Sequence, residues 1–284
     1  MYQSSLILEG GANRGIFTSG VLDYLMEQGF QVPYVVGVSA GACNAMGYVS
    51  NQRGRTRACV LAQSAERKKL EELRRVTKTR SLFDMDLIFD RFPNKEIPFD
   101  YDTYFSSPME CEMVVTNCRT GEAEYFSERK NRKRLMDICR ASSSVPVGAP
   151  MVHLNGQEYL DGGLADSVPI IHALQKGWKK NILVLTRNEG YRKKPLHTSR
   201  ALYQAAYMKY PQLIRTICKR ARVYNRTMAA VEKWEKQGRI FVIRPRMKAI
   251  GRLERDPQRL EDFYQDGYKQ MRERYQELLE YLER

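Results

Sequence analysis

The sequence predicts an α/β protein in which a mostly parallel central sheet is flanked by helices. Two short apolar runs, at 6–8 and 35–36, are each followed by a glycine-rich turn and then by a helical pattern. Successive strand–turn–helix units are typical of a parallel sheet, because each helix returns the chain to the edge where the next strand starts. A further apolar run at 181–186 predicts another strand of this sheet.

The other elements follow from local patterns. Apolar residues at helical spacing predict a helix over 16–28, which Gly29 ends. Lys and Arg dominate residues 53–80, so we expect a surface helix there. Residues 82–105 mix aromatic side chains with acids and prolines without a regular period, which predicts an irregular or short-helical insert. The remaining predicted strands lie at 112–116, 124–126, 157–160 and 240–243. A further helix is predicted over about 131–141, and the regions of about 198–237 and 256–284 are predicted to be mostly helical and strongly charged.

Composition narrows the partners and the compartment. The 284 residues carry 47 Lys and Arg against 33 Asp and Glu, a formal net charge of +14. Such an excess favours a polyanionic neighbour, either nucleic acid or an anionic membrane surface. The six cysteines form no CxxC pair, which fits reduced thiols better than a disulfide framework. The sequence shows no signal peptide and no apolar run of about 20 residues. We therefore expect a cytoplasmic protein that binds peripherally to the inner face of a membrane.

The segment EGGANRG at 9–15 directly follows the first predicted strand. Gly10, Gly11 and Gly15 allow another group to approach the backbone closely, and two kinds of ligand are compatible with that. The backbone N–H groups could cradle a nucleotide phosphate, or they could stabilise an oxyanion. The dinucleotide alternative is the weaker one, because the loop lacks the G-x-G spacing and no acidic residue is placed for a ribose contact.

The second turn, GVSAG at 37–41, fits the G-x-S-x-G pattern of a nucleophilic serine. Gly37 and Gly41 flank Ser39, because a sharp strand-to-helix elbow needs close backbone packing around an exposed hydroxyl. The alternative is an ordinary glycine-rich turn in which the serine caps the helix.

A serine nucleophile needs a base, and no histidine is placed to be one. The three histidines, His153, His172 and His197, follow no triad pattern. A lone aspartate can serve if it accepts the serine proton directly. Asp161 is the candidate, because it ends a predicted strand and is followed by Gly162 and Gly163, which allow a substrate or a serine to come close. All three motifs thus follow predicted strands, at the ends where α/β sheets place their sites.

Four motifs in this order resemble those of the patatin-like phospholipase family. The loop at 9–15 is similar to that family's G-G-G-x-R/K-G, with Ala12 in place of the third glycine, and GVSAG is similar to its nucleophile motif. ASSSVP at 141–146 resembles its A-S-x-A-x-P stretch, and DGGLADSVP at 161–169 resembles its D-G-G/A-x-x-x-N-x-P. The resemblance covers about residues 5–190. It implies a three-layer fold, with a catalytic domain over 1–190 and a basic, mostly helical extension over 191–284 packed on the same domain.

The resemblance also implies an activity, that of a bacterial lipid acyl hydrolase with a Ser39–Asp161 dyad and no histidine, metal or organic cofactor. Gly10, Gly11 and Ala12 would then form the oxyanion hole, and Arg14 would hold the loop or attract a lipid phosphate. We expect the substrate to be a phospholipid or a related lipid at an anionic membrane surface.

Two alternative activities stay open. Acyl transfer to an acceptor other than water would use the same residues. Nucleic-acid binding through the basic, tyrosine-rich segment 187–226 is less favoured, because no nucleic-acid motif is present. Nothing in the sequence indicates an oligomeric state.

Overall fold

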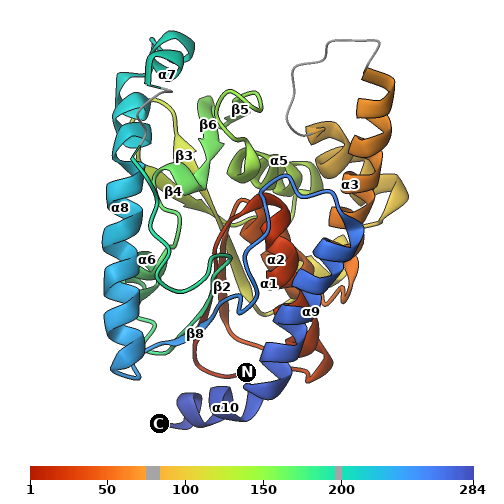
Figure 1. Cartoon of the computed structure of the whole chain (residues 1–284), viewed down its shortest axis with the longest axis vertical. Helices are drawn as coiled ribbons and strands as arrows, with labels where there is room; N and C mark the ends of the chain where they lie inside the picture. Colours follow the sequence, from red (N-terminus) through yellow and green to blue (C-terminus); the bar gives the residue numbers. More distant parts are fainter. Residues whose placement is uncertain (75–83, 196–199) are drawn as a thin grey trace.

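An eight-stranded sheet forms the middle of the molecule, with helices on both of its faces (Figure 1). The computed structural model describes residues 1–74, 84–195 and 200–284, without the side chains of 67–74 and 200. Parallel pairing joins the strands in the order β3-β2-β1-β7-β8. β4 and β6 pair antiparallel with β3, and β5 pairs antiparallel with β6. The strands are β1 (Ser5–Leu8), β2 (Tyr34–Val38), β3 (Glu110–Asn117), β4 (Ala123–Phe126), β5 (Val152–Leu154), β6 (Gln157–Asp161), β7 (Asn181–Val184) and β8 (Phe241–Ile243).

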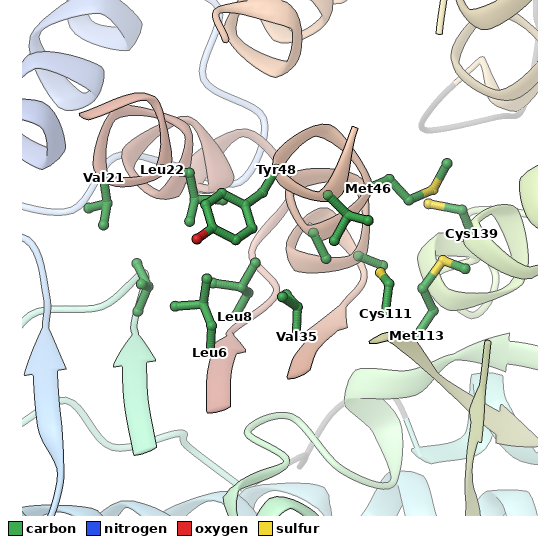
Figure 2. Close-up of a cluster of buried hydrophobic side chains, with 14 of the residues drawn as sticks. Leu6, Leu8, Val21, Leu22, Val35, Met46, Tyr48, Cys111, Met113 and Cys139 are labelled. Atoms are coloured by element: carbon green, nitrogen blue, oxygen red, sulfur yellow. The ribbon is translucent and has the colours of Figure 1, made fainter. Parts of the chain in front are cut away.

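The two faces of the sheet carry separate cores, because successive side chains of a strand point to opposite faces. Leu6 and Leu8 of β1 pack on one side with Leu22 and Tyr48 from the helices that cover it, as Figure 2 shows. Ile7, between them, belongs to the core of the other face. The helices over the first face are α1 (Gly15–Glu27), α2 (Ala40–Val49), α5 (Arg132–Ser143) and α9 (Pro257–Glu273), and those over the second are α6 (Ile170–Gln175) and α8 (Pro211–Lys236).

The predicted α/β fold with a helical C-terminal region is confirmed, and most predicted elements are present. The insert at 82–105 contains a π-helix, η2 (Leu87–Glu96), and a short helix, α4 (Tyr101–Ser106), in agreement with the absence of a regular period. The helix expected at 53–80 is α3 (Arg55–Arg74); residues 75–83 lie outside the described part of the chain. The other short elements are η1 (Ala12–Arg14), η3 (Gly162–Leu164), α7 (Arg200–Ala206) and α10 (Tyr275–Glu283).

The C-terminal region adds a strand to the sheet and packs a helix against α1. β8 extends the sheet by pairing with β7, and α9 crosses α1 at very short distance. A Cβ atom added at Gly20 would lie 2.1 Å from the carbonyl oxygen of Tyr264, and one added at Gly267 would lie 2.1 Å from that of Phe17. α1 is therefore buried on nearly all sides rather than on one apolar face. No helix of the described residues is long and apolar enough to cross a bilayer.

Candidate active site

β3 brings the predicted nucleophile and the predicted base together. β2 runs beside β3 as far as Val38, which pairs with Val114, and Ser39 follows at once. β6 arrives from the opposite direction and ends at Asp161, which pairs with Val115. Two strand ends therefore meet head to head beside neighbouring residues of a third strand. The sequence pattern predicted the meeting of the two residues but not the antiparallel strand that achieves it.

Ser39 occupies a strained turn between β2 and α2. Its backbone angles are φ 57° and ψ −123°, a left-handed conformation that a non-glycine residue rarely adopts. The turn is tight, since a Cβ atom added at Gly37 would lie 2.3 Å from the carbonyl oxygen of Gly41. The N–H of Ser39 donates to the hydroxyl of Ser142 at 2.9 Å. This geometry has the features of the elbow that the G-x-S-x-G pattern requires.

Asp161 is buried and held by two backbone contacts. Its Oδ1 accepts from the N–H of Gly163 at 2.7 Å, and its own N–H donates to the carbonyl oxygen of Ser144 at 2.8 Å. The segment at 141–146 thus contacts both strand ends, through Ser142 and Ser144. Among the described residues no hydrogen bond joins Ser39 to Asp161, although both line one cavity. Catalytic hydrogen bonds are often long without substrate and tighten when it binds.

The glycine loop lies against Ser39. A Cβ atom added at Gly10 would lie 3.0 Å from the Cβ of Ser39, so the loop backbone and the serine are in contact. The hydrogen bonds found among the described residues do not use the backbone N–H of Gly10, Gly11 or Ala12 as a donor. Ala12 has a φ of 51°, the left-handed region in which the family motif has glycine. Three N–H groups that donate to no other group of the described residues therefore lie in the loop next to Ser39.

Neighbouring elements fix this loop. The hydroxyl of Thr186, just after β7, donates to the carbonyl oxygen of Gly10 at 2.9 Å. The carboxylate of Glu9 accepts from the N–H of Thr186 at 2.7 Å and from the hydroxyl of Tyr224 on α8 at 3.0 Å. Asn13 donates from its side chain to the carbonyl oxygen of Glu254 at 2.7 Å. The C-terminal region thus supports the loop from two sides.

Arg14 is buried behind the loop, and its Nε has no partner among the described residues. Burial, and then the charges of Arg187 and Arg252, lower the pKa of Arg14 to about 10. The other motif residues lie at the ends of the same elements: Gly15 begins α1, Gly162 packs on Val114 of β3, and Gly163 follows it in η3.

An apolar cavity opens on one side of Ser39. Its empty space is about 940 Å³, counting the part open to solvent. The insert at 82–105 supplies part of the wall, and α2, α3 and α5 supply most of the rest, together with the glycine loop and Val145. The lining side chains include Met46, Val60, Ile88, Phe89, Phe92 and Met136. A lining dominated by apolar side chains is typical of a site for an apolar ligand.

A second cavity lies on the other side of Ser39 and is lined by both Ser39 and Asp161. Its empty space is about 600 Å³, counting the part open to solvent. Its walls carry five cationic side chains: Arg14, Arg187, Lys193, Arg220 and Arg252. From the sequence, only Arg14 of these five is expected at the site. Three of the other four, Arg187, Lys193 and Arg220, lie in the basic segment 187–226, which the sequence had singled out only as a surface for a polyanion. Arg252 lies beyond that segment.

The histidines take other places. His172 shares a hydrogen bond of 2.7 Å with Glu112 and stacks on Tyr125, and His153 lies near Glu158. Neither lines either cavity, and His197 lies outside the described residues. Within the described part of the chain, no group of three or more His, Cys, Asp or Glu side chains is placed to hold a metal ion.

The chain is similar to proteins of the family that its sequence motifs resemble. The sequence model of the family described as patatin-like phospholipase matches residues 6–174, and that of a domain of unknown function, DUF6363, matches residues 210–283. The uncharacterized protein YjjU of Escherichia coli is 33% identical over 188 residues, which are 64% of this chain and 51% of that protein. Human patatin-like phospholipase domain-containing protein 4 is 37% identical over 59 residues, 20% of this chain and 23% of that protein.

The chain therefore matches about half the length of the bacterial relative and a quarter of the human one. Among solved structures, VipD from Legionella pneumophila matches 99% of this chain and 66% of its own, with 14% identity and a TM-score of 0.47.

Proposed function

The chain belongs to the patatin-like phospholipase family, and on that premise we propose that it hydrolyses ester bonds of phospholipids or related lipids with Ser39 as nucleophile and Asp161 as base. One observation carries the proposal: the ends of β2 and β6 meet on β3, so that both residues line one cavity beside a loop with free N–H groups. An apolar cavity on the other side of Ser39 suits the acyl chain.

In this reaction the Ser39 hydroxyl attacks the ester carbonyl and passes its proton to Asp161. The N–H of Gly163 already occupies Oδ1, which leaves Oδ2 of Asp161 to accept the proton. The carbonyl oxygen becomes an oxyanion, and the N–H groups of Gly10, Gly11 and Ala12 stabilise it. Each such donor lowers the barrier by roughly 2.7–4 kcal/mol.

The intermediate then collapses. Asp161 returns the proton to the departing alkoxide, and the acyl group stays on Ser39 as an ester. A water molecule, deprotonated by Asp161, attacks this ester. Asp161 then returns the proton to the departing Ser39 oxygen, and the fatty acid is released. Transfer to another alcohol would differ only in this last step.

The test is hydrolysis of phospholipids and neutral glycerides with labelled acyl chains. We expect the wild type to release free fatty acid, Ser39→Ala to release none, and Asp161→Asn to lose about 10²–10⁴ in rate, as for a lost general base. The matched control replaces His153, His172 and His197 by Gln, and we expect it to keep turnover within about tenfold, a barrier change of ~1.4 kcal/mol.

Two results would overturn the assignment in different ways. If one histidine replacement is as damaging as Asp161→Asn in a folded protein, the base is part of a triad. If the label appears in an ester of an added alcohol rather than in free fatty acid, the enzyme is an acyltransferase.

A further inference from the structure

The two cavities meet at Ser39 and differ in chemical character. Ala12, Ser39 and Val145 line both of them. An ester carbonyl at Ser39 therefore has its acyl chain in the apolar cavity and its alcohol part in the other. The side chains of the second cavity then decide which alcohol part is accepted.

The cationic side chains of the second cavity outnumber its carboxylates, five to two. Among the described residues none of the five forms an ion pair, and the only carboxylates in the lining are Glu9 and Asp161. Burial, and then the charges of Arg220 and Arg252, lower the pKa of Lys193 well below its ordinary value. The cluster thus repels itself, and a bound anion would relieve that repulsion.

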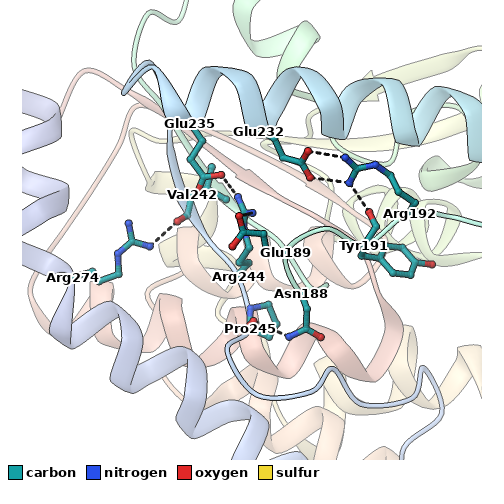
Figure 3. Close-up of polar contacts among 10 residues, drawn as sticks. All are labelled: Asn188, Glu189, Tyr191, Arg192, Glu232, Glu235, Val242, Arg244, Pro245 and Arg274. Carbon is teal, nitrogen blue, oxygen red and sulfur yellow. Dashed lines mark hydrogen bonds and ion pairs between the residues drawn. The ribbon is translucent and has the colours of Figure 1, made fainter.

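The cationic wall is held in place without a ligand. Figure 3 shows Arg192 with two hydrogen bonds to Glu232 of α8, at 2.8 and 2.7 Å, and Asn188 bound to the carbonyl oxygen of Pro245 at 2.9 Å. These contacts fix both ends of the segment from Arg187 to Lys193. A preformed set of donors loses little entropy when an anion binds.

The wall fits a phosphate better than a zwitterionic headgroup. Guanidinium groups match the geometry of phosphate oxygens through paired N–H donors. A quaternary ammonium would need a free aromatic face. The aromatic ring in the cavity lining, that of Tyr191, already has the guanidinium of Arg187 4.2 Å from its centre. An added ammonium group would also meet the surplus of positive charge.

We propose that the second cavity binds a phosphate monoester next to the scissile ester, so that the preferred substrate is an acylglycerol phosphate without a further headgroup. The inference rests on the proposed hydrolase function of Ser39. Four of the cations, Arg187, Lys193, Arg220 and Arg252, lie beyond the family match at 6–174, and two of these lie in the 210–283 region of unknown function. That region then supplies two of the side chains that determine headgroup specificity.

The test compares two substrates that differ only by the phosphate: hexanoyl glycerol 3-phosphate and hexanoyl glycerol, both as dissolved monomers. We expect kcat/KM to favour the phosphate ester by more than about tenfold, which is the order of one charge-assisted hydrogen bond. Arg187→Gln with Arg252→Gln should reduce that ratio at least about tenfold through KM. The matched control is Lys248→Gln, which removes an exposed charge outside the cavity.

Binding to the Ser39→Ala protein separates the claim that the second cavity binds a phosphate monoester from the claim that Ser39 is a hydrolase nucleophile. Calorimetry should show that hexanoyl glycerol 3-phosphate binds more tightly than hexanoyl glycerol, and that the double variant loses this difference. Inorganic phosphate should compete only weakly, since it lacks the acyl chain; equal competition would assign the cavity to free phosphate and overturn the lipid claim. Hydrolysis of both esters at equal kcat/KM would overturn the headgroup inference while the hydrolase function stands. If hexanoyl glycerol 3-phosphate binds tightly, loses affinity in the double variant and is not hydrolysed by the wild type, the hydrolase function alone would be overturned.

Discussion

Ala12 stands where the family motif has glycine, and its φ of 51° shows why glycine suits that position. Ala12→Gly removes a left-handed strain of about 1–2 kcal/mol, which the greater freedom of glycine in the unfolded chain offsets by about 0.5–1 kcal/mol. We therefore expect a free energy of unfolding in chemical denaturation that is equal to that of the wild type or higher by up to about 1.5 kcal/mol, and equal or higher turnover of a short-chain ester.

Gly11→Val should act in the opposite direction. A Cβ atom at this position would lie 2.7 Å from the hydroxyl oxygen of Thr186, which holds the carbonyl of Gly10. Displacing the loop should cost about 10²–10³ in kcat, as for a lost oxyanion donor. Full activity of this variant would mean that the loop does not stabilise the oxyanion.

Single residues of the site could be predicted where a local motif carries them. Ser39 and Asp161 each lie in a short pattern of glycines whose geometric reason is readable from the sequence. Arg220 and Arg252 lie in no such pattern, because their role depends on how α8 and the connection before α9 pack over the loop. The free N–H groups at 10–12 were predicted as donors, whereas the support from Thr186 and Tyr224 was not.

At the scale of elements, the wall of the apolar cavity is shared by four helices. Val60 of α3 is half-buried and faces the cavity. Val60→Phe should shorten the cavity, so that two or three CH₂ groups of a long acyl chain no longer fit. Since each buried CH₂ contributes about 0.8 kcal/mol, kcat/KM for long acyl chains should fall by about 30-fold. Short-chain esters should be hydrolysed as before.

Rates on esters of four to sixteen carbons measure this shift, with Val60→Ala as the control that leaves room for longer chains. An unchanged chain-length profile in the Phe variant would place the acyl chain elsewhere.

Sequence patterns predicted the long elements and the short strands β4 and β8, but missed two other short elements, β5 and α6. β5 has three residues and α6 has six, too few for a period to show. The helix at 16–28 was predicted from its apolar face, but its complete burial depends on Gly20 and Gly267, which allow α9 to cover it. Such long-range contacts leave no local pattern.

At the scale of the whole molecule, we propose that the C-terminal region and the catalytic part fold as one unit. Gly267→Leu would force a side chain against the backbone of Phe17, 2.1 Å from its carbonyl oxygen. We expect the free energy of unfolding to fall by at least ~2 kcal/mol, as for overpacking in a core. Lys269→Leu, at an exposed position of α9, is the control.

Denaturation followed by far-UV circular dichroism and by esterase activity measures this effect. Coincident loss of both signals supports one unit. Loss of the C-terminal helices alone, with activity retained, would contradict it.

The net charge of +14 and an exposed basic face of α8 predict binding to anionic membranes. Arg215, Lys219, Arg222 and Arg226 are exposed at helical spacing on that helix. Each contributes about 1 kcal/mol near an anionic surface, so reversing the last three to Glu should weaken binding to anionic vesicles strongly. Sedimentation at rising salt measures this. Reversal of Lys248, Lys269 and Arg272 is the control, and equal binding to neutral vesicles would exclude an electrostatic membrane contact.

The central claim is that Ser39 is the nucleophile of a serine hydrolase, and the site of covalent modification by a fluorophosphonate tests it most directly. The strained elbow and the neighbouring N–H groups predict that the wild type reacts at Ser39. Mass mapping of the digested adduct should therefore find the label on the peptide that contains Ser39, and Ser39→Ala should carry no label. A label on another serine, with Ser39 unmodified in the folded wild type, would contradict the account.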